Sequence, residues 1–506
     1  MSEKIAIECK KITKRFGTVL ANDQIDFKVR YGEILALLGE NGSGKTTLMN
    51  MLSGIYHPDE GEIHVAGNKV AIQSPSDSME LGIGMIHQHF KLVDNFCARD
   101  NIELGTKGKK EKNKVLNNKI IEISKKYGLE IEPEKYVYNM SVSEKQTVEI
   151  LKVLYKGADI LILDEPTAVL TPQETEKLFK ILRRMKEKGC AIVIITHKLN
   201  EVLEISDRVT ILRKGRSIQT VETKDCDTNK LTELMVGKAV NLEIERPEVG
   251  SGKTILKLVE LSVIDSSGRR SLNDINIEIK KGEILGVAGI AGSGQKELCE
   301  VIAGLQVANE GAILHKKENI LGKSPAEIIA RGISMSFVPE DRLGMGLVAS
   351  MGMTDNMLLK SYKSNKGPFV KRKPAKELAE SLVKKLSIVT PGVETPVRLM
   401  SGGNVQKVLL GREIESQPNV VITAYPVRGL DINSSYTVYD LINEQKKKDV
   451  AIIFVAEDLD VILEISDRIA VLCNGEITGI LDARNTTKEE VGLLMTGHKK
   501  EGKENE

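Results

Sequence analysis

Short uninterrupted apolar runs recur along the chain, separated by longer stretches in which polar and apolar residues mix. Residues 34–38 (ILALL), 160–163 (ILIL) and 191–195 (AIVII) are three such runs. Apolar runs of about four to eight residues are typical of strands buried on both faces of a sheet, and the mixed stretches between them predict helices. The alternation predicts an α/β fold with a largely parallel sheet.

This pattern occurs twice. Residues 31–48 (YGEILALLGENGSGKTTL) align without a gap with residues 281–298 (KGEILGVAGIAGSGQKEL). Asp207 later aligns with Asp467, so the offset between the copies grows from 250 to 260 residues. A repeat of this length indicates a tandem duplication of one domain. We expect a first domain at residues 1–244, a linker at 245–254, a second domain at 255–496 and a charged tail at 497–506.

Composition excludes several classes of protein. Lys and Arg number 72 and Asp and Glu 71, so no strong field for nucleic acid or an anionic membrane is expected. The six cysteines contain no C-x-x-C pair, which argues against a disulfide framework or a zinc site and for reduced thiols in the cytosol. The longest apolar runs are far shorter than the roughly 20 residues that span a bilayer. We therefore expect neither a transmembrane segment nor a nucleic-acid partner.

A phosphate-binding loop follows the first apolar run. Residues 39–46 match the pattern G-x-x-x-x-G-K-[ST] in full, which favours a nucleotide site over a plain glycine turn. Glycines let backbone N–H groups approach phosphates at a helix N-terminus, Lys45 adds a positive charge, and the Thr46 hydroxyl suits Mg²⁺. The residues expected to bind the nucleotide here are Gly39, Asn41, Gly42, Ser43, Gly44, Lys45, Thr46 and Thr47.

Two carboxylates end the apolar run at 160–163. Placed at the carboxyl end of a buried strand, Asp164 would hold Mg²⁺ through water and Glu165 would act as general base on the attacking water. A carboxylate pair at a strand end can also be a helix cap. The phosphate loop upstream favours catalysis.

Two further motifs complete a series. SVSEKQ (residues 141–146) precedes LILDEPT (161–167), and VIITH (193–197) follows it. With the phosphate loop, the series resembles the signature, Walker B and switch-histidine motifs of the ATP-binding-cassette (ABC) family. The resemblance occurs once in each copy, and the two copies together cover nearly the whole chain. It implies two P-loop ATPase domains, each with a mostly parallel sheet core, an antiparallel β subdomain and a helical subdomain. It also implies ATP and Mg²⁺ as cofactors.

The resemblance assigns further residues of the first copy. Gln88 would be the lid glutamine, which contacts Mg²⁺ and water and senses the transporter, and His197 would hold the γ-phosphate. Phe16 would stack on adenine, although an ordinary core role for it is an open alternative. The catalytic residues are then Lys45, Gln88, Glu165 and His197, and the Mg²⁺ ligands are Thr46, Gln88 and Asp164.

The second copy differs at each of these chemical positions. Gln295, Lys296, Glu340, Ala424, Tyr425 and Glu457 stand where the first copy has Lys45, Thr46, Gln88, Asp164, Glu165 and His197. Loss of a general base alone lowers a rate by roughly 10²- to 10⁴-fold, so we expect no hydrolysis there by the usual route. Gly289, Gly292 and Gly294 still offer N–H groups to a nucleotide, but the second copy could also serve only as a scaffold.

The signature motif is intact only in the second copy. Ser401, Gly402 and Gly403 are retained there, whereas the first copy has Val142 and Glu144 within its motif. In the family, each nucleotide lies between the phosphate loop of one domain and the signature of the other. The resemblance therefore implies one complete site, with an intact loop and an intact signature, and one degenerate site.

One consensus and one degenerate site resemble the ATPase subunits of bacterial importers for simple sugars and nucleosides. MIHQHFKLV (85–93) and DEPTAVLTPQE (164–174) look most like the nucleoside type. This resemblance implies an ATP-hydrolysing subunit at the cytoplasmic face of the membrane. Its partners would be two transmembrane permease subunits and, through them, an extracytoplasmic substrate-binding lipoprotein. The alternative is a soluble fused ABC ATPase acting on ribosomes or nucleic acid, although such proteins usually have a long charged linker and two complete sites.

Overall fold

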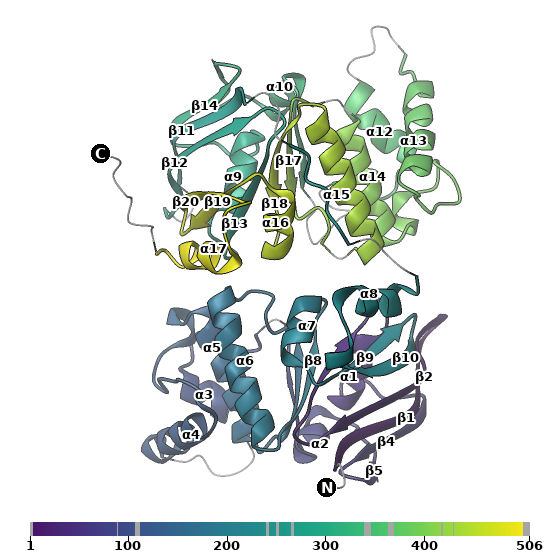
Figure 1. Cartoon of the computed structure of the whole chain (residues 1–506), viewed down its shortest axis with the longest axis vertical. Helices are drawn as coiled ribbons and strands as arrows, with labels where there is room; N and C mark the ends of the chain where they lie inside the picture. Colours follow the sequence, from purple (N-terminus) through teal and green to yellow (C-terminus); the bar gives the residue numbers. More distant parts are fainter. Residues whose placement is uncertain are drawn as a thin grey trace. The chain divides into compact units, whose positions relative to one another are not determined.

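The computed structural model divides the chain into two compact units, Met1–Asn241 and Leu242–Glu506 (Figure 1). The residues that it describes are 4–88, 90–106, 112–238, 242–248, 252–264, 268–337, 346–362, 369–415, 418–428 and 430–498. Residues 499–506 of the predicted tail, residues 249–251 of the predicted linker and the lid position Glu340 lie outside the described residues. Each unit is described by itself.

The first unit is built on a six-stranded sheet of the described residues, with the order β10-β9-β3-β8-β7-β6. The strands are β3 (Ile34–Leu38), β6 (Ile83–Ile86), β7 (Ile160–Asp164), β8 (Ala191–Ile195), β9 (Arg208–Arg213) and β10 (Arg216–Glu222). All neighbours are parallel except β9 and β10, which are antiparallel. The predicted α/β class with a largely parallel sheet is confirmed.

A second, antiparallel sheet and a group of helices flank this core (Figure 1). The sheet has the order β2-β1-β4-β5, with β1 (Ile5–Phe16), β2 (Val19–Arg30), β4 (Glu60–Val65) and β5 (Asn68–Val70). The helices are α1 (Lys45–Leu52), α2 (Pro75–Glu80), α3 (Ala98–Glu103), α4 (Asn113–Tyr127), α5 (Val142–Tyr155), α6 (Pro172–Glu187), α7 (Leu199–Ile205) and α8 (Thr228–Val236). Helices α3, α4 and α5 pack together as the helical subdomain.

The second unit repeats this architecture. Its antiparallel sheet, β12-β11-β14-β15, contains β11 (Thr254–Ile264), β12 (Arg270–Lys280), β14 (Glu310–His315) and β15 (Glu318–Asn319). Its core sheet, β16-β17-β18-β13-β19-β20, contains β13 (Ile284–Gly289), β16 (Ile333–Phe337), β17 (Val420–Ala424), β18 (Ala451–Val455), β19 (Arg468–Cys473) and β20 (Glu476–Asp482). The helices are α9 (Gln295–Ile302), α10 (Pro325–Ala330), α12 (Met353–Ser361), α13 (Lys373–Lys385), α14 (Gly402–Ile414), α15 (Ile432–Lys447), α16 (Leu459–Ile465) and α17 (Lys488–Met495).

Strands β3 and β8 of the core sheet are apolar throughout because both faces of the sheet are covered there. In the first unit, Ile192 and Ile194 belong to one hydrophobic cluster, and Ala191 and Val193 belong to another. Successive side chains of a strand point to opposite faces, so a strand covered on both sides favours apolar residues at every position. This is why uninterrupted apolar runs located the strands.

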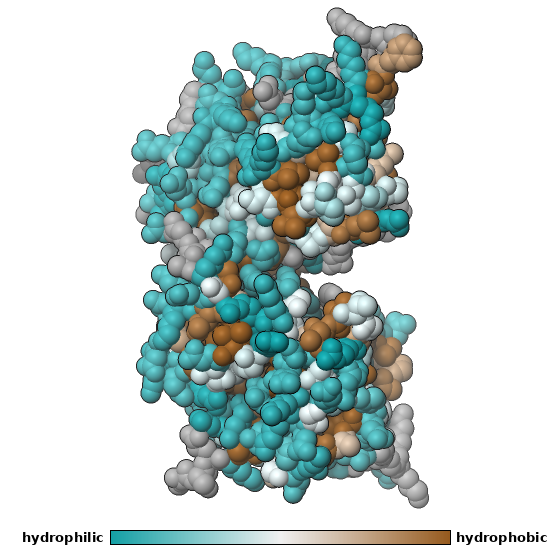
Figure 2. All heavy atoms as spheres, turned by 90° about the vertical axis from the view of Figure 1, so that its right-hand side faces the viewer, coloured by the Kyte–Doolittle hydropathy of each residue, from teal (hydrophilic) through white to brown (hydrophobic). Residues whose placement is uncertain are grey.

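The start of the predicted linker is bonded to the second unit. Arg246 Nη1 donates to the carbonyl oxygens of Leu463 at 3.1 Å and Ser466 at 2.7 Å. On the face shown in Figure 2, hydrophilic side chains cover most of the surface and hydrophobic ones form small patches. Within the described ranges, no helix has both the length and the apolar character needed to cross a membrane.

Candidate functional site

Strand register brings the predicted catalytic segments of the first unit to one edge of the core sheet. Leu37 and Asp164 both pair with Ile195, and Ile86 pairs with Leu163. The phosphate loop, Gln88, Glu165 and His197 therefore leave the sheet within one or two residues of these pairs. This edge is where the carboxyl ends of parallel strands meet, the usual ligand site of open α/β sheets.

The phosphate loop between β3 and α1 has a backbone that requires glycine. Gly42 has a φ of 79° and Gly44, the N-cap of α1, a φ of 95°. A Cβ atom on Gly44 would lie 2.5 Å from the Ala21 carbonyl oxygen, so both backbone and space exclude a larger residue. Among the other loop residues, Ser43 and Lys45 are buried, Asn41 and Thr46 exposed and Thr47 half-buried.

Two buried polar groups of this loop suit a polyphosphate. Lys45 Nζ donates to the carbonyl oxygens of Gly39 at 2.7 Å and Glu40 at 3.0 Å, so the amine folds back over the loop. Burial lowers the pKa of Lys45, and the charges of Glu165 and Asp164 act in the opposite direction. Ser43 Oγ is buried without a hydrogen-bond partner among the described residues. Buried hydroxyls usually have a hydrogen-bond partner, and a phosphate oxygen would be a suitable acceptor for this one.

Glu165 and His197 form a close pair. Glu165 has a φ of 46°, unusual for a residue with a side chain, and its N–H donates to the Ile195 carbonyl at 2.8 Å. Its Oε1 lies 2.8 Å from His197 Nδ1, which donates when it carries the proton. Burial alone would raise the pKa of Glu165, but the bond to His197 and the charges of His197, Lys45 and Lys198 bring it below the ordinary value. The carboxylate is therefore ionised and able to accept a proton.

The residues predicted for Mg²⁺ supply oxygen ligands only. Burial, and then the charge of Glu165, raises the pKa of Asp164 to about 6, against an opposing effect of Lys45. A cation near this pair of carboxylates would offset their repulsion, and a hydroxyl, an amide oxygen and a carboxylate are ligands that Mg²⁺ accepts. The donor set Thr46, Gln88 and Asp164 thus fits the ion. No cluster of three or more His, Cys, Asp and Glu suited to another metal occurs in the described part of the chain.

Phe16 is a surface residue. It ends β1, is 41% exposed and makes an edge-to-face contact with Tyr56 at 5.1 Å between ring centroids. Lys14 Nζ lies 5.6 Å from its ring. The core alternative for Phe16 therefore does not apply, and its ring is available for stacking. Tyr56 carried no sequence motif that could have predicted this contact.

The second unit keeps the backbone of the site but not its chemistry. Gly292 and Gly294 have φ values of 85° and 112°, and Gln295 Nε2 donates to the Ile290 carbonyl at 3.1 Å, in place of Lys45. The side chain of Lys296 is 56% exposed and lies 3.7 Å from Glu300, so it does not replace that amine. Tyr425 has a φ of 55°, as Glu165 does. An aromatic ring thus stands where the first unit has the Glu165 carboxylate.

The two signature helices begin differently. Ser141 caps α5, and its own N–H donates to the Glu144 carboxylate at 2.8 Å, while that carboxylate also pairs with Lys135 Nζ at 2.6 Å. In α14, the Ser401 side chain makes no capping bond and instead accepts from Asn404 Nδ2 at 2.9 Å. A carboxylate in the first turn of α5 therefore offsets the positive end of that helix, whereas α14 has no acidic residue in its first turn.

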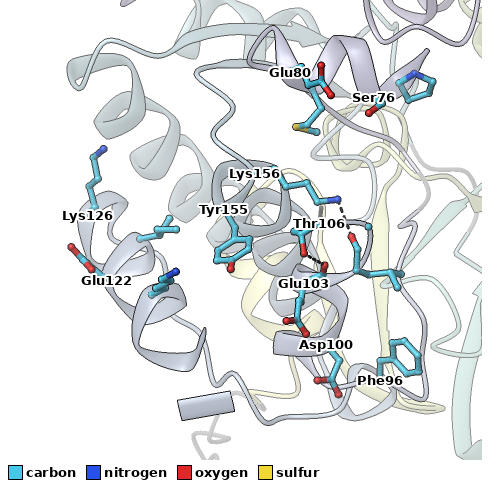
Figure 3. Close-up of a pocket in the computed structure, with 16 residues that line it drawn as sticks. Ser76, Glu80, Phe96, Asp100, Glu103, Thr106, Glu122, Lys126, Tyr155 and Lys156 are labelled. Carbon is cyan, nitrogen blue, oxygen red and sulfur yellow. Dashed lines mark hydrogen bonds between the residues drawn. The ribbon is translucent and has the colours of Figure 1, made fainter. Parts of the chain in front are cut away.

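A groove of about 1400 Å³ lies beside the helical subdomain of the first unit (Figure 3). It is lined by α2, α3, α4 and the end of α5, and Lys156 Nζ donates across it to the Leu104 carbonyl at 2.9 Å. The segment after Gln88 is bonded to the same α5, because the Lys91 N–H donates to Glu149 at 2.6 Å and Lys152 Nζ donates to the Lys91 carbonyl at 2.8 Å. One helix thus links the groove to the segment after Gln88.

Comparisons with known proteins agree on the family. Residues 22–168 and 272–426, more than half of the chain, match the family model described as ABC transporter. The nucleoside import ATP-binding protein NupA of Lactococcus lactis is 41% identical over 98% of this chain and 99% of its own length. The guanosine import ATP-binding protein NupO of Bacillus subtilis is 42% identical over 99% of both chains. The xylose import ATP-binding protein XylG of Moorella thermoacetica is 39% identical over 97% of this chain and 99% of its own length. The chain therefore belongs to the ABC transporter family, with one copy of the family domain in each unit.

Proposed function

We propose that this chain drives import of a nucleoside and hydrolyses ATP only at the site of the first unit. The broader prediction, an ATPase subunit of an ABC importer for a nucleoside or a sugar, is confirmed by the family and by the relatives named above. These import proteins give no support to the alternative of a ribosome-directed factor. The main support for hydrolysis at a single site is the Glu165–His197 pair, in which Oε1 and Nδ1 are 2.8 Å apart. The second unit has Tyr425 and Glu457 at the corresponding positions.

In this proposal, the chemistry is in-line attack of water on the γ-phosphorus of ATP. Glu165 takes a proton from the water as the water oxygen bonds to the γ-phosphorus. The bond from the γ-phosphorus to the β-phosphate oxygen breaks, and ADP and phosphate are released. Lys45 and the N–H groups at the start of α1 stabilise the charge that develops on the phosphate oxygens. Mg²⁺, held by Thr46, Gln88 and Asp164, would neutralise the β- and γ-phosphates. His197 orients the Glu165 carboxylate and can donate to the γ-phosphate.

The roles of Ser401, Gly402 and Gly403 belong to the same proposal. They begin α14, whose N-terminus has no acidic cap, and two glycines there add no side chains that would exclude a phosphate. The start of a helix is favourable for an anion. We assign them contact with a γ-phosphate, and Gly289, Gly292 and Gly294 contact with a nucleotide that is not hydrolysed. Stacking of Phe16 on adenine is supported by its exposed ring.

We also propose that transmembrane permease subunits contact the first unit at the groove of Figure 3, at the cytoplasmic face of the membrane. The hydrogen bonds between α5 and Lys91 support this site. A displacement of α5 at the groove would also displace the segment after Gln88, to which the helix is bonded. A substrate-binding lipoprotein would act through the permease. A nucleoside is preferred over a sugar because two of the three relatives above, at 41% and 42% identity, are named for nucleoside or guanosine import.

The test of single-site hydrolysis is Glu165→Gln against Tyr425→Phe, its matched control in the second unit. Loss of the base should lower kcat by roughly 10²- to 10⁴-fold while ATP binding is retained, and the control should stay within about twofold of wild type. Steady-state ATPase and binding of a fluorescent ATP analogue are measured. Residual activity of Glu165→Gln above about a tenth would remove Glu165 from the base role. Uptake of labelled guanosine and xylose by cells with and without the chain tests the substrate.

A further inference from the structure

A buried hydrogen bond joins the two segments that carry Glu165 and His197. Thr167 Oγ1 donates to Glu201 Oε2 at 2.5 Å, and the two residues are only 2% and 9% exposed. Thr167 lies two residues beyond Glu165 in the loop after β7. Glu201 lies four residues beyond His197, in α7. The bond therefore connects the loop of the base to the helix that follows the histidine.

Lys198 completes this polar group. Its Nζ donates to the Thr167 carbonyl at 3.3 Å and lies 3.1 Å from Glu201 Oε1. A carboxylate this far from solvent is costly unless it is paired and hydrogen-bonded, and Thr167 and Lys198 meet both needs. In a poorly hydrated setting such a group is directional and holds its members in one arrangement.

The second unit serves as an internal control for the group. Its corresponding residues are Val427, Val461 and Asp458. Both valines pack against the hydrophobic core, and Asp458 instead caps α16 by accepting the Asp460 N–H at 2.9 Å. The turn at the end of the strand is nevertheless the same, since the Tyr425 N–H donates to Val455 at 2.8 Å. The fold therefore does not require the polar group, which occurs in the unit that has Glu165 and His197.

We propose that Thr167, Glu201 and Lys198 are positioning residues that keep His197 within hydrogen-bond distance of Glu165. The His197 side chain is 59% exposed, so packing alone does little to fix its ring. Anchoring α7 to the loop of Glu165 fixes the backbone on either side of the pair. The inference rests on the roles proposed above for Glu165 and His197, because small misplacements of reacting groups cost large factors in rate.

The test is ATP hydrolysis by the full-length chain carrying Thr167→Val and Glu201→Val together, which copies the valines of the second unit. The double substitution leaves no unpaired buried carboxylate, so the melting temperature should stay within a few degrees of wild type. We expect kcat to fall about 10- to 100-fold. KM for ATP should not change, because the phosphate loop is intact.

Two further variants separate positioning from stability. Thr167→Ser keeps the hydroxyl and should keep the wild-type kcat, whereas Thr167→Val alone should lose both kcat and melting temperature. A double variant within about twofold of wild-type kcat, or one whose KM rises in step with the loss of kcat, would overturn the positioning role. Glu165→Gln is assayed beside it: if that variant stays active, the proposed function fails instead.

Discussion

The ends of β7 and β17 have nearly the same backbone and very different chemistry. Glu165 and Tyr425 both have a left-handed φ, of 46° and 55°, and both N–H groups donate at 2.8 Å to the last residue of the next strand. Such a conformation costs a residue with a side chain on the order of 1–3 kcal/mol. Because the second unit retains it without a catalytic carboxylate, the turn belongs to the sheet architecture. The proposed base, Glu165, occupies a turn that the fold already makes.

Around this shared turn, the polar partners differ. His197 faces Glu165 in the first unit, whereas in the second Arg428 lies 6.0 Å from the Tyr425 ring and 3.4 Å from Glu457. The signature helices show the reverse asymmetry, since the acidic cap is in the first unit and the open N-terminus in the second. This asymmetry agrees with the roles proposed above for the two units, which the following substitutions test.

Among the substitutions that test this asymmetry, Ser401→Arg has the largest expected effect. Ser401→Arg should lower ATPase activity by roughly 10²- to 10³-fold, the cost of losing a donor to a developing phosphate charge, because the new side chain fills the open start of α14. Ser141→Arg should lower activity only a few-fold. Steady-state ATPase of each variant with its permease is the measurement. Equal losses would mean that both sites hydrolyse ATP and that the units are less different than their motifs indicate.

A smaller effect is expected from exchanging the acidic cap. Asn404→Glu should let a carboxylate cap α14 as Glu144 caps α5, and repulsion of phosphate there should lower kcat about tenfold or more. The matched change, Glu144→Asn, should leave kcat within about twofold and destabilise the first unit by about 1 kcal/mol through the weakened cap. ATPase assays and thermal unfolding test both. Unchanged activity of Asn404→Glu would show that the start of α14 does not meet a phosphate.

The smallest expected effect is on the pH dependence of the free energy of unfolding. His315 of β14 is buried, with Nε2 unpartnered among the described residues, and the first unit has Val65 at this position. Burial, and then the charge of Lys316, lowers the pKa of His315. Its stabilising contribution is therefore present above the unfolded pKa of about 6.5 and is lost as pH falls through the lower folded pKa.

His315→Val should remove this sensitivity. Between pH 7.5 and pH 5.5, the melting temperature of the wild type should fall more than that of the variant, as followed by calorimetry. A matched control, Val65→Ile in the first unit, should show the wild-type pH dependence. If the variant and the wild type lose stability in parallel, protonation of His315 does not contribute in this range.

Most of the fold could be predicted because its strands have a local signal. The apolar run at 34–38 coincides with β3 and that at 191–195 with β8, since both faces of these strands are buried. The family was likewise predicted from motif order and is confirmed. One helix start also had a local signal that the interpretation of the motifs did not use: Ser141 and Glu144 match the S-x-x-E pattern of a capping box, which predicts that the Glu144 carboxylate accepts the Ser141 N–H.

The sequence by itself determined the duplication, the apolar core strands, the phosphate loop and the different residues that the second copy has at the proposed catalytic positions. These follow from residue identity and short-range spacing. Only the tertiary structure decided that Glu165 meets His197, that Thr167 meets Glu201 and that Phe16 is exposed beside Tyr56. The physical reason is that these contacts depend on which strands lie next to each other and in what register. That choice is made by packing of the whole sheet, and no local stretch of the chain records it.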